Sequence, residues 1–182
     1  MFYLLFLVVT ALEMLFEVRI SIRNSAALIR RGAIEIGPAV LPVMTMMYIV
    51  MYMGSVVEFL LSHPVLPLWW LLLFLMIFVL AKGLKFWAVS TLGEYWTMKL
   101  LILPESKVVT AGPYRWVRHP NYIAVLLEIA ATTLLGKCFV TFGVVFFSFL
   151  VVLRYRIRLE EEGLLSHTDY AAGMTSKRRF LP

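Results

Sequence analysis

The chain has 182 residues, of which 62% are hydrophobic and 15% are charged, and its mean hydropathy is +0.87. Soluble domains carry about 25% charged residues, so this composition excludes an ordinary soluble domain and indicates helices packed in a lipid membrane. The net charge of +6 therefore bears on membrane orientation, and we expect no nucleic-acid partner.

The first predicted span covers residues 1–20, which are apolar except for Thr10, Glu13, Glu17 and Arg19. It lacks the basic start and the small-residue cleavage site of a signal peptide, so we expect it to be retained. Glu13 and Glu17 lie four residues apart and share one helix face; they either snorkel to the interface or line a polar cavity. A short polar segment follows, which we place in the cytoplasm and which contains Arg19, Arg23, Arg30 and Arg31.

The second predicted span opens at Gly37 and Pro38 and runs to about residue 61. It is rich in methionine, which suits either an adaptable apolar groove or a lipid-facing surface. These methionines are Met44, Met46, Met47, Met51 and Met53. A third span starts at Leu68, has an aromatic belt at Trp69 and Trp70, and ends near Lys82 and Lys85, which can snorkel toward the inner surface.

Residues 90–119 form the longest stretch without a predicted span. Two shorter apolar runs follow, residues 121–135 and 138–153, and the two-residue link Gly136-Lys137 makes them an antiparallel helical hairpin. Glu128 lies inside the first run. A carboxylate there costs roughly 3 kcal/mol on insertion scales, so Glu128 should face the bundle or a cavity. The single cysteine, Cys138, excludes an internal disulfide and a cysteine metal cluster.

Only Lys137 of the 17 Lys and Arg residues falls on the proposed outer side. This asymmetry places the N-terminus outside and the C-terminus in the cytoplasm. The predicted fold is an all-α, polytopic integral membrane protein with about five transmembrane helices. We divide it into three N-terminal helices (residues 1–89), on the side of a membrane acceptor, and a C-terminal region (residues 90–182) that holds the polar motifs.

Polar residues are concentrated in two motifs, which the topology places on the same, cytoplasmic side. Residues 112–122 read Gly-Pro-Tyr-Arg-Trp-Val-Arg-His-Pro-Asn-Tyr, and residues 154–162 read Arg-Tyr-Arg-Ile-Arg-Leu-Glu-Glu-Glu. In a helix, Arg154 and Arg158 share one face, whereas Arg156 and Glu160 share another. Each motif alone could be an interfacial anchor or a solvated helix end. Together they favour an active site at the membrane surface.

These paired motifs, with a hydrophobic hairpin between them and Tyr170 downstream, resemble the isoprenylcysteine carboxyl methyltransferase family over residues 92–170. Members are integral membrane enzymes that use S-adenosylmethionine. Residues 92–96 (Leu-Gly-Glu-Tyr-Trp) and 110–114 (Thr-Ala-Gly-Pro-Tyr) are similar to the bacterial branch that O-methylates long-chain alkylpyrones, which implies a bacterial inner membrane. One departure is Ala124, where many members carry Gly.

The resemblance implies that S-adenosylmethionine is held by His119, Pro120, Tyr122, Glu160 and Glu161. We add Tyr114, as an aromatic face for the sulfonium, and Arg118 of the same motif to this cofactor site. The resemblance also implies that Arg158, with Arg156 beside it, orients the substrate.

The residue types suit this chemistry independently of the resemblance. A sulfonium favours aromatic faces, the cofactor's hydroxyl and amino groups need carboxylate acceptors, and an arginine fork orients an acidic oxygen nucleophile. The leaving group is neutral, so the reaction needs no general acid and no metal, and the chain offers no Cys/His metal set. The expected partner is a lipophilic acceptor from the bilayer, while the oligomeric state stays open.

Two other functions remain possible at this point. One is an NADPH-dependent membrane reductase of the steroid-reductase type, whose members share His-Pro-Asn-Tyr but usually place a Glu shortly after the Tyr, where this chain has Ile123, Ala124 and Val125. The other is a non-catalytic membrane scaffold, which would not need both polar motifs.

Overall fold

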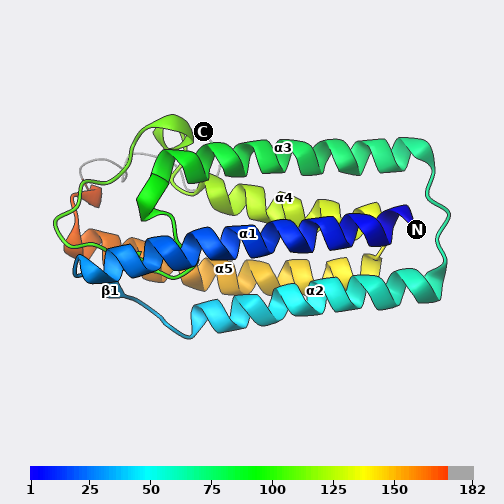
Figure 1. The fold of residues 1–182 in the computed structure, drawn as a ribbon, viewed down its shortest axis with the longest axis horizontal. Helices are drawn as coiled ribbons and strands as arrows, with labels where there is room; N and C mark the ends of the chain where they lie inside the picture. The colour runs from blue at the N-terminus through cyan, green and yellow to red at the C-terminus, as the bar shows by residue number, and fades with distance from the viewer. Residues whose placement is uncertain (172–182) are drawn as a thin grey trace.

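The computed structural model describes residues 1–171 and shows an all-α bundle whose helices run side by side along one axis (Figure 1). The α-helices are α1 (Phe2–Arg30), α2 (Val40–Ser62), α3 (Leu68–Leu92), α4 (Pro120–Leu135) and α5 (Phe139–His167). Two short 3-10 helices, η1 (Gly93–Tyr95) and η2 (Gly112–Arg115), and two short strands, β1 (Ile34–Glu35) and β2 (Leu101–Ile102), lie in the connections. The predicted polytopic helical fold is confirmed.

Three stretches are long and apolar enough to cross a membrane: Val40–Ser62, Leu68–Tyr95 and Phe139–His167. The hairpin helix α4 is shorter but apolar, and α1 runs alongside the others (Figure 1). Because Glu13, Glu17 and Arg19 interrupt its apolar residues, α1 lacks a long stretch with few charges of the kind found in those three. The five expected spans thus correspond to three long apolar helices, one short apolar helix and one helix with internal charges.

Several helices continue beyond their predicted ends. We expected a polar connection after Ile20, but α1 remains helical to Arg30, because its C-terminal half has a buried polar face. On that face, the Asn24 amide donates to the carbonyls of Gly93 and Trp96, and Ser21 Oγ accepts from the Met98 amide. Likewise α3 extends past Lys85 to Leu92, and α5 extends past residue 153 to His167.

The two ends of the bundle differ in character. The N-terminus, the α2–α3 link and the α4–α5 turn lie at one end, whereas residues 93–119 and the end of α5 gather at the other (Figure 1). The α4–α5 turn at Gly136 and Lys137 confirms the predicted hairpin. At the other end, β1 pairs with β2 in an antiparallel register of Ile34 with Ile102. Both polar motifs therefore lie at the loop-rich end.

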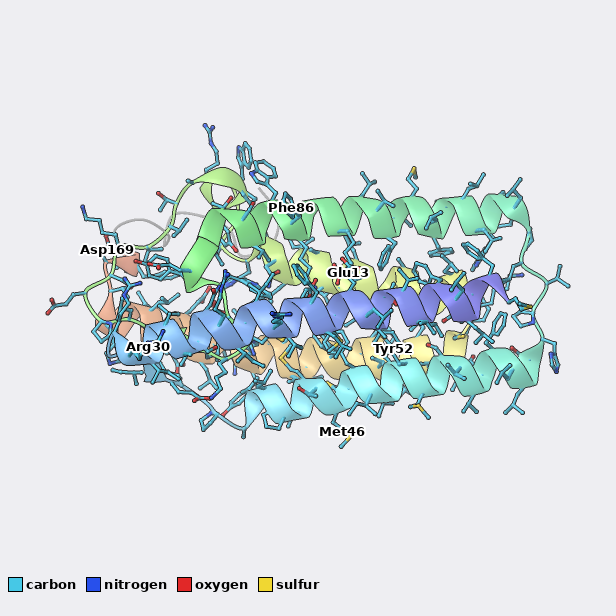
Figure 2. The ribbon with its side chains drawn as sticks, viewed as in Figure 1. Glu13, Arg30, Met46, Tyr52, Phe86 and Asp169 are labelled. Atoms are coloured by element: carbon cyan, nitrogen blue, oxygen red, sulfur yellow. The ribbon has the colours of Figure 1, made fainter. Side chains whose placement is uncertain are left out.

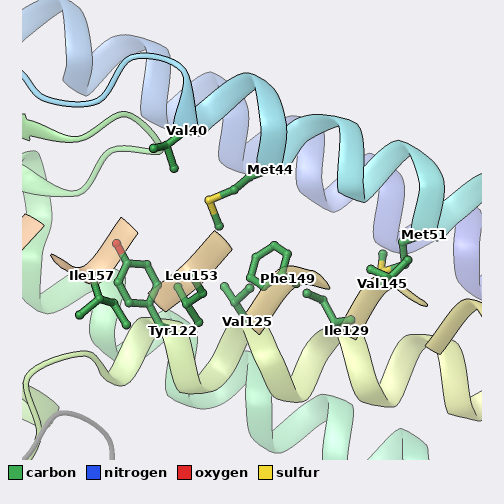
Figure 3. Close-up of a cluster of buried hydrophobic side chains, with 10 residues drawn as sticks. All are labelled: Val40, Met44, Met51, Tyr122, Val125, Ile129, Val145, Phe149, Leu153 and Ile157. Atoms are coloured by element: carbon green, nitrogen blue, oxygen red, sulfur yellow. The ribbon is translucent and has the colours of Figure 1, made fainter. Parts of the chain in front are cut away.

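Apolar side chains from α2, α4 and α5 form the main core (Figure 3). Its buried members are Val40, Met44, Met51, Tyr122, Val125, Ile129, Val145, Phe149, Leu153 and Ile157. Other apolar residues face outward: Met46 of α2 and Phe86 of α3 project from the bundle and are 59% and 76% exposed (Figure 2). In lipid, close packing rather than removal from water holds such a core together.

The orientation leads to a labelling prediction. A cysteine introduced as Lys137→Cys at the α4–α5 turn should react with a membrane-impermeant maleimide added outside intact cells. Ala111→Cys, at an exposed position of the opposite end, should react only after permeabilisation. The wild-type chain gives the background, because its Cys138 is fully buried. Reaction of Lys137→Cys from the cytoplasmic side alone would reverse the proposed orientation.

Candidate active site

The first polar motif is shaped by a glycine and a proline. Gly112 has φ +54°, and the side chains of Trp87 and Thr91 on α3 occupy the space that a Cβ at this position would need. Glycine therefore lets the chain turn against α3 and begin η2. Pro120 is the first residue of α4, where its missing N–H costs nothing, and His119 immediately precedes the helix. The motif thus fixes His119 and Tyr122 at the start of α4.

Glu161 of α5 gathers three side chains around one buried carboxylate oxygen. Its Oε1 lies 3.1 Å from His119 Nε2, 3.3 Å from Arg118 Nη1 and 3.5 Å from the Tyr170 hydroxyl, which donates to it. Burial, followed by the charge of Glu161, raises the pKa of Tyr170 to about 12, so its hydroxyl stays a donor at neutral pH. This carboxylate ties both polar motifs and the downstream tyrosine into one cluster.

A second set of bonds joins α4 and α5 through Arg156, which is 5% exposed. Arg156 Nε donates to the Tyr122 hydroxyl at 2.8 Å, and Nη2 donates to the Met98 carbonyl at 2.8 Å. Tyr122 in turn donates to Glu160. The guanidinium of Arg156 thereby connects both helices to residues 93–119.

Two cavities meet at this contact. The first, which we name the loop cavity, lies at the loop-rich end beneath residues 101–109. Its polar wall contains Tyr114, Arg118, His119, Tyr122, Arg156 and Glu160. The connection that covers it is held to the end of α5 by the amides of Glu105 and Val108, which donate to the His167 carbonyl and to Asp169 Oδ1, each at 2.8 Å.

The second, which we name the membrane cavity, lies between α1, α2, α3 and α4. Its apolar wall includes Met44 and Met51 of α2 and Val125 of α4. Both cavities share one boundary, made of Trp96, Thr97, Asn121, Tyr122 and Arg156. A more polar compartment and a more apolar compartment are thus separated by the Tyr122–Arg156 contact.

An ion-pair network lines the membrane cavity. Lys85 Nζ lies 2.6 Å from Glu17 and 3.1 Å from Glu128, and Lys82 Nζ lies 3.3 Å from Glu128 and 3.4 Å from Glu17. The expectation that Glu128 faces the bundle or a cavity is confirmed, since it is 8% exposed and lines this one. Glu17 lines the cavity, which was one of the two alternatives given for it, whereas Lys85, which we expected to snorkel toward the inner surface, is buried and pairs with Glu17.

The structure brings most of the predicted site residues together. Tyr114, Arg118, His119, Tyr122, Arg156 and Glu160 line the loop cavity. Pro120 and Glu161 are buried behind it as supports. Arg158 is different: its side chain is exposed, lines neither cavity and forms no hydrogen bond or ion pair with a residue in the described range 1–171. The buried arginine beside Tyr122 is Arg156.

Sequence reasoning missed the shared boundary of the cavities. Asn121 lies inside the first motif, and its Oδ1 is buried without a hydrogen-bond partner among residues 1–171. Its place in the motif, between Pro120 and Tyr122 of the predicted cofactor site, is the sequence feature that could have identified Asn121 as a site residue. Met98 contributes a main-chain carbonyl, which no sequence pattern reveals.

Comparison with known proteins gives a consistent assignment. Residues 72–166 match the model of the isoprenylcysteine carboxyl methyltransferase (ICMT) family. The chain is 32% identical over 168 residues to the uncharacterized protein YpbQ of Bacillus subtilis (strain 168), covering 92% of this chain and 99% of that protein. It is 29% identical over 157 residues to an uncharacterized protein of Haemophilus influenzae, covering 84% and 88% of the two chains. No solved structure matches the chain.

Proposed function

Because the chain belongs to the isoprenylcysteine carboxyl methyltransferase family, we propose that it is a membrane methyltransferase that moves a methyl group from S-adenosylmethionine to an acidic oxygen of a lipophilic acceptor. The acceptor oxygen is a carboxylate or an acidic hydroxyl, as in an isoprenylcysteine or a long-chain alkylpyrone. The observation that carries this proposal is the meeting of a more polar and a more apolar cavity at Tyr122 and Arg156.

The loop cavity suits the cofactor. Glu160 lines it with a side chain that is 27% exposed, so its carboxylate can accept from hydroxyl and amino groups. The rings of His119 and Tyr122 are stacked, with centroids 5.4 Å apart, and with Tyr114 they supply aromatic faces that favour a sulfonium. Glu161 is already engaged by Arg118, His119 and Tyr170, so we assign it the task of holding these donors in place.

The membrane cavity suits the acceptor. Its walls come mainly from the N-terminal region (residues 1–89), and the apolar surface of Met44 and Met51 can adapt to a long chain. The acceptor reaches it laterally from the bilayer, whereas the water-soluble cofactor reaches the loop cavity from the cytoplasm. We place the chain in a bacterial inner membrane with the N-terminus outside.

Arg156 is the residue that best fits the orientation of the acceptor. Its buried charge favours the ionised form of an acidic oxygen, and its planar fork fixes that oxygen in line with the methyl group. When bound, S-adenosylmethionine supplies an electrophilic methyl group and a neutral leaving group. The protein therefore has to hold two reactants in line and exclude water, which is catalysis by proximity.

The direct test is incubation of the purified protein with labelled S-adenosylmethionine and a panel of acceptors: a prenylcysteine, a long-chain hydroxypyrone and an aminophospholipid. We expect label in the product of one of the two oxygen acceptors.

His119→Ala should weaken cofactor binding, measured by calorimetry. Binding of a nicotinamide cofactor with no methyl transfer to any acceptor would instead support a reductase.

Two arginines on opposite faces of α5 allow a matched comparison. Arg156→Lys keeps the charge but loses the two-point contact, so turnover with bound cofactor should fall about tenfold or more, or roughly 1.4 kcal/mol of transition-state stabilisation. Arg158→Lys, at an exposed position, should stay near the wild-type rate. Single-turnover methylation alongside cofactor titration measures both effects. If Arg158→Lys loses turnover while Arg156→Lys is unaffected, Arg158 and not Arg156 orients the acceptor.

Two methionines of α2 test the acceptor cavity. Met51 is 2% exposed and lines the membrane cavity, whereas Met53 is 61% exposed. Met51→Trp should fill part of the cavity and shift the preference toward shorter acceptors, with little change in cofactor affinity. Met53→Trp makes the same exchange on the outer surface and should leave the chain-length profile unchanged. If Met51→Trp slows short and long acceptors equally, the acceptor does not occupy this cavity.

A further inference from the structure

The proposed methyl transfer at Tyr122 and Arg156 assigns no role to the ion-pair network of the membrane cavity. Glu17, Lys82, Lys85 and Glu128 all line this cavity. Charged side chains at this depth are costly, roughly 3 kcal/mol each on insertion scales, and commonly mark a functional site. One ion pair would be enough to tie α3 to its neighbours, so a network that faces a cavity calls for another explanation.

The same cavity wall contains polar atoms whose hydrogen-bonding capacity is not met. Glu128 Oε1 is buried and accepts no hydrogen bond from residues 1–171, although Lys82 Nζ lies 3.3 Å away. Thr132 lies one turn further along α4, and its side chain, like that of Tyr48 on α2, lines the cavity. Neither hydroxyl forms a hydrogen bond with a described residue. A polar group without a hydrogen-bond partner costs free energy where no water is available to bond it.

The charge of this wall indicates what kind of group it accepts. Two carboxylates, Glu17 and Glu128, face two ammonium groups, Lys82 and Lys85, so the charges of these four side chains sum to zero when all are ionised, and the remaining charge of the lining is that of Arg156 at the boundary. Glu13 also contacts Lys82 at 3.1 Å, but it lies outside the lining and its side chain is 41% exposed. A ligand that carries a full charge would leave these four side chains and the ligand with a net charge. A neutral hydroxyl can donate to Glu128 and accept from Tyr48, Thr132 or a lysine at the same time.

We propose that this wall is a second subsite of the acceptor cavity, which binds a hydroxyl on the chain of the acceptor, away from the oxygen that is methylated. Glu128 follows Tyr122 by six residues of α4, or about 9 Å along the helix. The hydroxyl therefore belongs in the middle of a long chain. The subsite rests on the proposed function, since it names a feature of the acceptor of that reaction.

The test measures binding alone, without cofactor, on the full chain purified in detergent. The probes are a long-chain saturated fatty acid, the same acid with one mid-chain hydroxyl, and the same acid with a mid-chain ketone. The hydroxy acid should bind about tenfold more tightly than the unsubstituted acid, which corresponds to about 1.4 kcal/mol. The ketone, which cannot donate to Glu128, should gain less than the hydroxyl.

Single-hydroxyl deletions locate the effect. Thr132→Val and Tyr48→Phe should each reduce the preference for the hydroxy acid and leave the affinity for the unsubstituted acid unchanged. Thr45→Val is the matched control, because Thr45 lines the same cavity but already donates to the Leu41 carbonyl of its own helix. A purely structural role would lower thermal stability and affect both acids equally.

The outcomes separate the two proposals. Three outcomes would overturn the subsite. The hydroxy and unsubstituted acids could bind with equal affinity, or neither could bind. The third is a loss of preference in Thr45→Val that is as large as in Thr132→Val. Because the measurement needs no methyl transfer, a clear preference together with no methylation of any acceptor would instead reject the methyltransferase and leave a hydroxylated-lipid site.

Discussion

A buried guanidinium must have its N–H groups bonded inside the protein, and in this chain Arg156 meets that demand across three segments. It bonds the Tyr122 hydroxyl of α4 and the Met98 carbonyl of the connection from residues 93 to 119, and it stands on α5 itself. Removing the Tyr122 hydroxyl would leave a buried N–H of the guanidinium without a hydrogen bond, at a cost of roughly 1–3 kcal/mol. The positions of α4, α5 and the inner connection are therefore coupled through one side chain.

This coupling explains how a small bundle can keep two cavities apart. Arg156 and Tyr122 stand between them, and the Glu161 cluster holds Arg118 and His119 on the side of the loop cavity. The inner half of α1 supports the same arrangement, because Asn24 and Ser21 bond the main chain of residues 93–98. Hydrogen bonds from α1 and α5 thus converge on one short connection, which borders both cavities at Trp96 and Thr97.

Much of this architecture could be predicted from local sequence. Hydrophobic runs located the helices, and Gly136-Lys137 located the hairpin turn. The two polar motifs identified part of the loop-cavity wall, including Arg118, His119 and Glu160, while residues 92–109 supply much of the rest. Local patterns failed where the decisive partner is distant in sequence. Arg23 and Arg30 look like a polar connection until Asn24 is seen to bond Gly93 and Trp96. Arg156 and Arg158 are equivalent in sequence, and only the position of Tyr122 decides which faces inward.

For the proposed methyl transfer, the contrast between the cavities gives a physical basis for sorting two reactants of opposite character. The loop cavity offers Glu160, Arg118 and His119 near the loop-rich end, so a zwitterionic, water-soluble molecule loses little on binding there. The membrane cavity offers methionine surface and a neutral ion-pair network, so it rejects an added charge but accepts a chain with a polar neutral group. An acidic acceptor can then place its charge only at the boundary, beside Arg156. That boundary is also the one place where contents of both cavities can touch, so charge matching and reaction geometry select the same position.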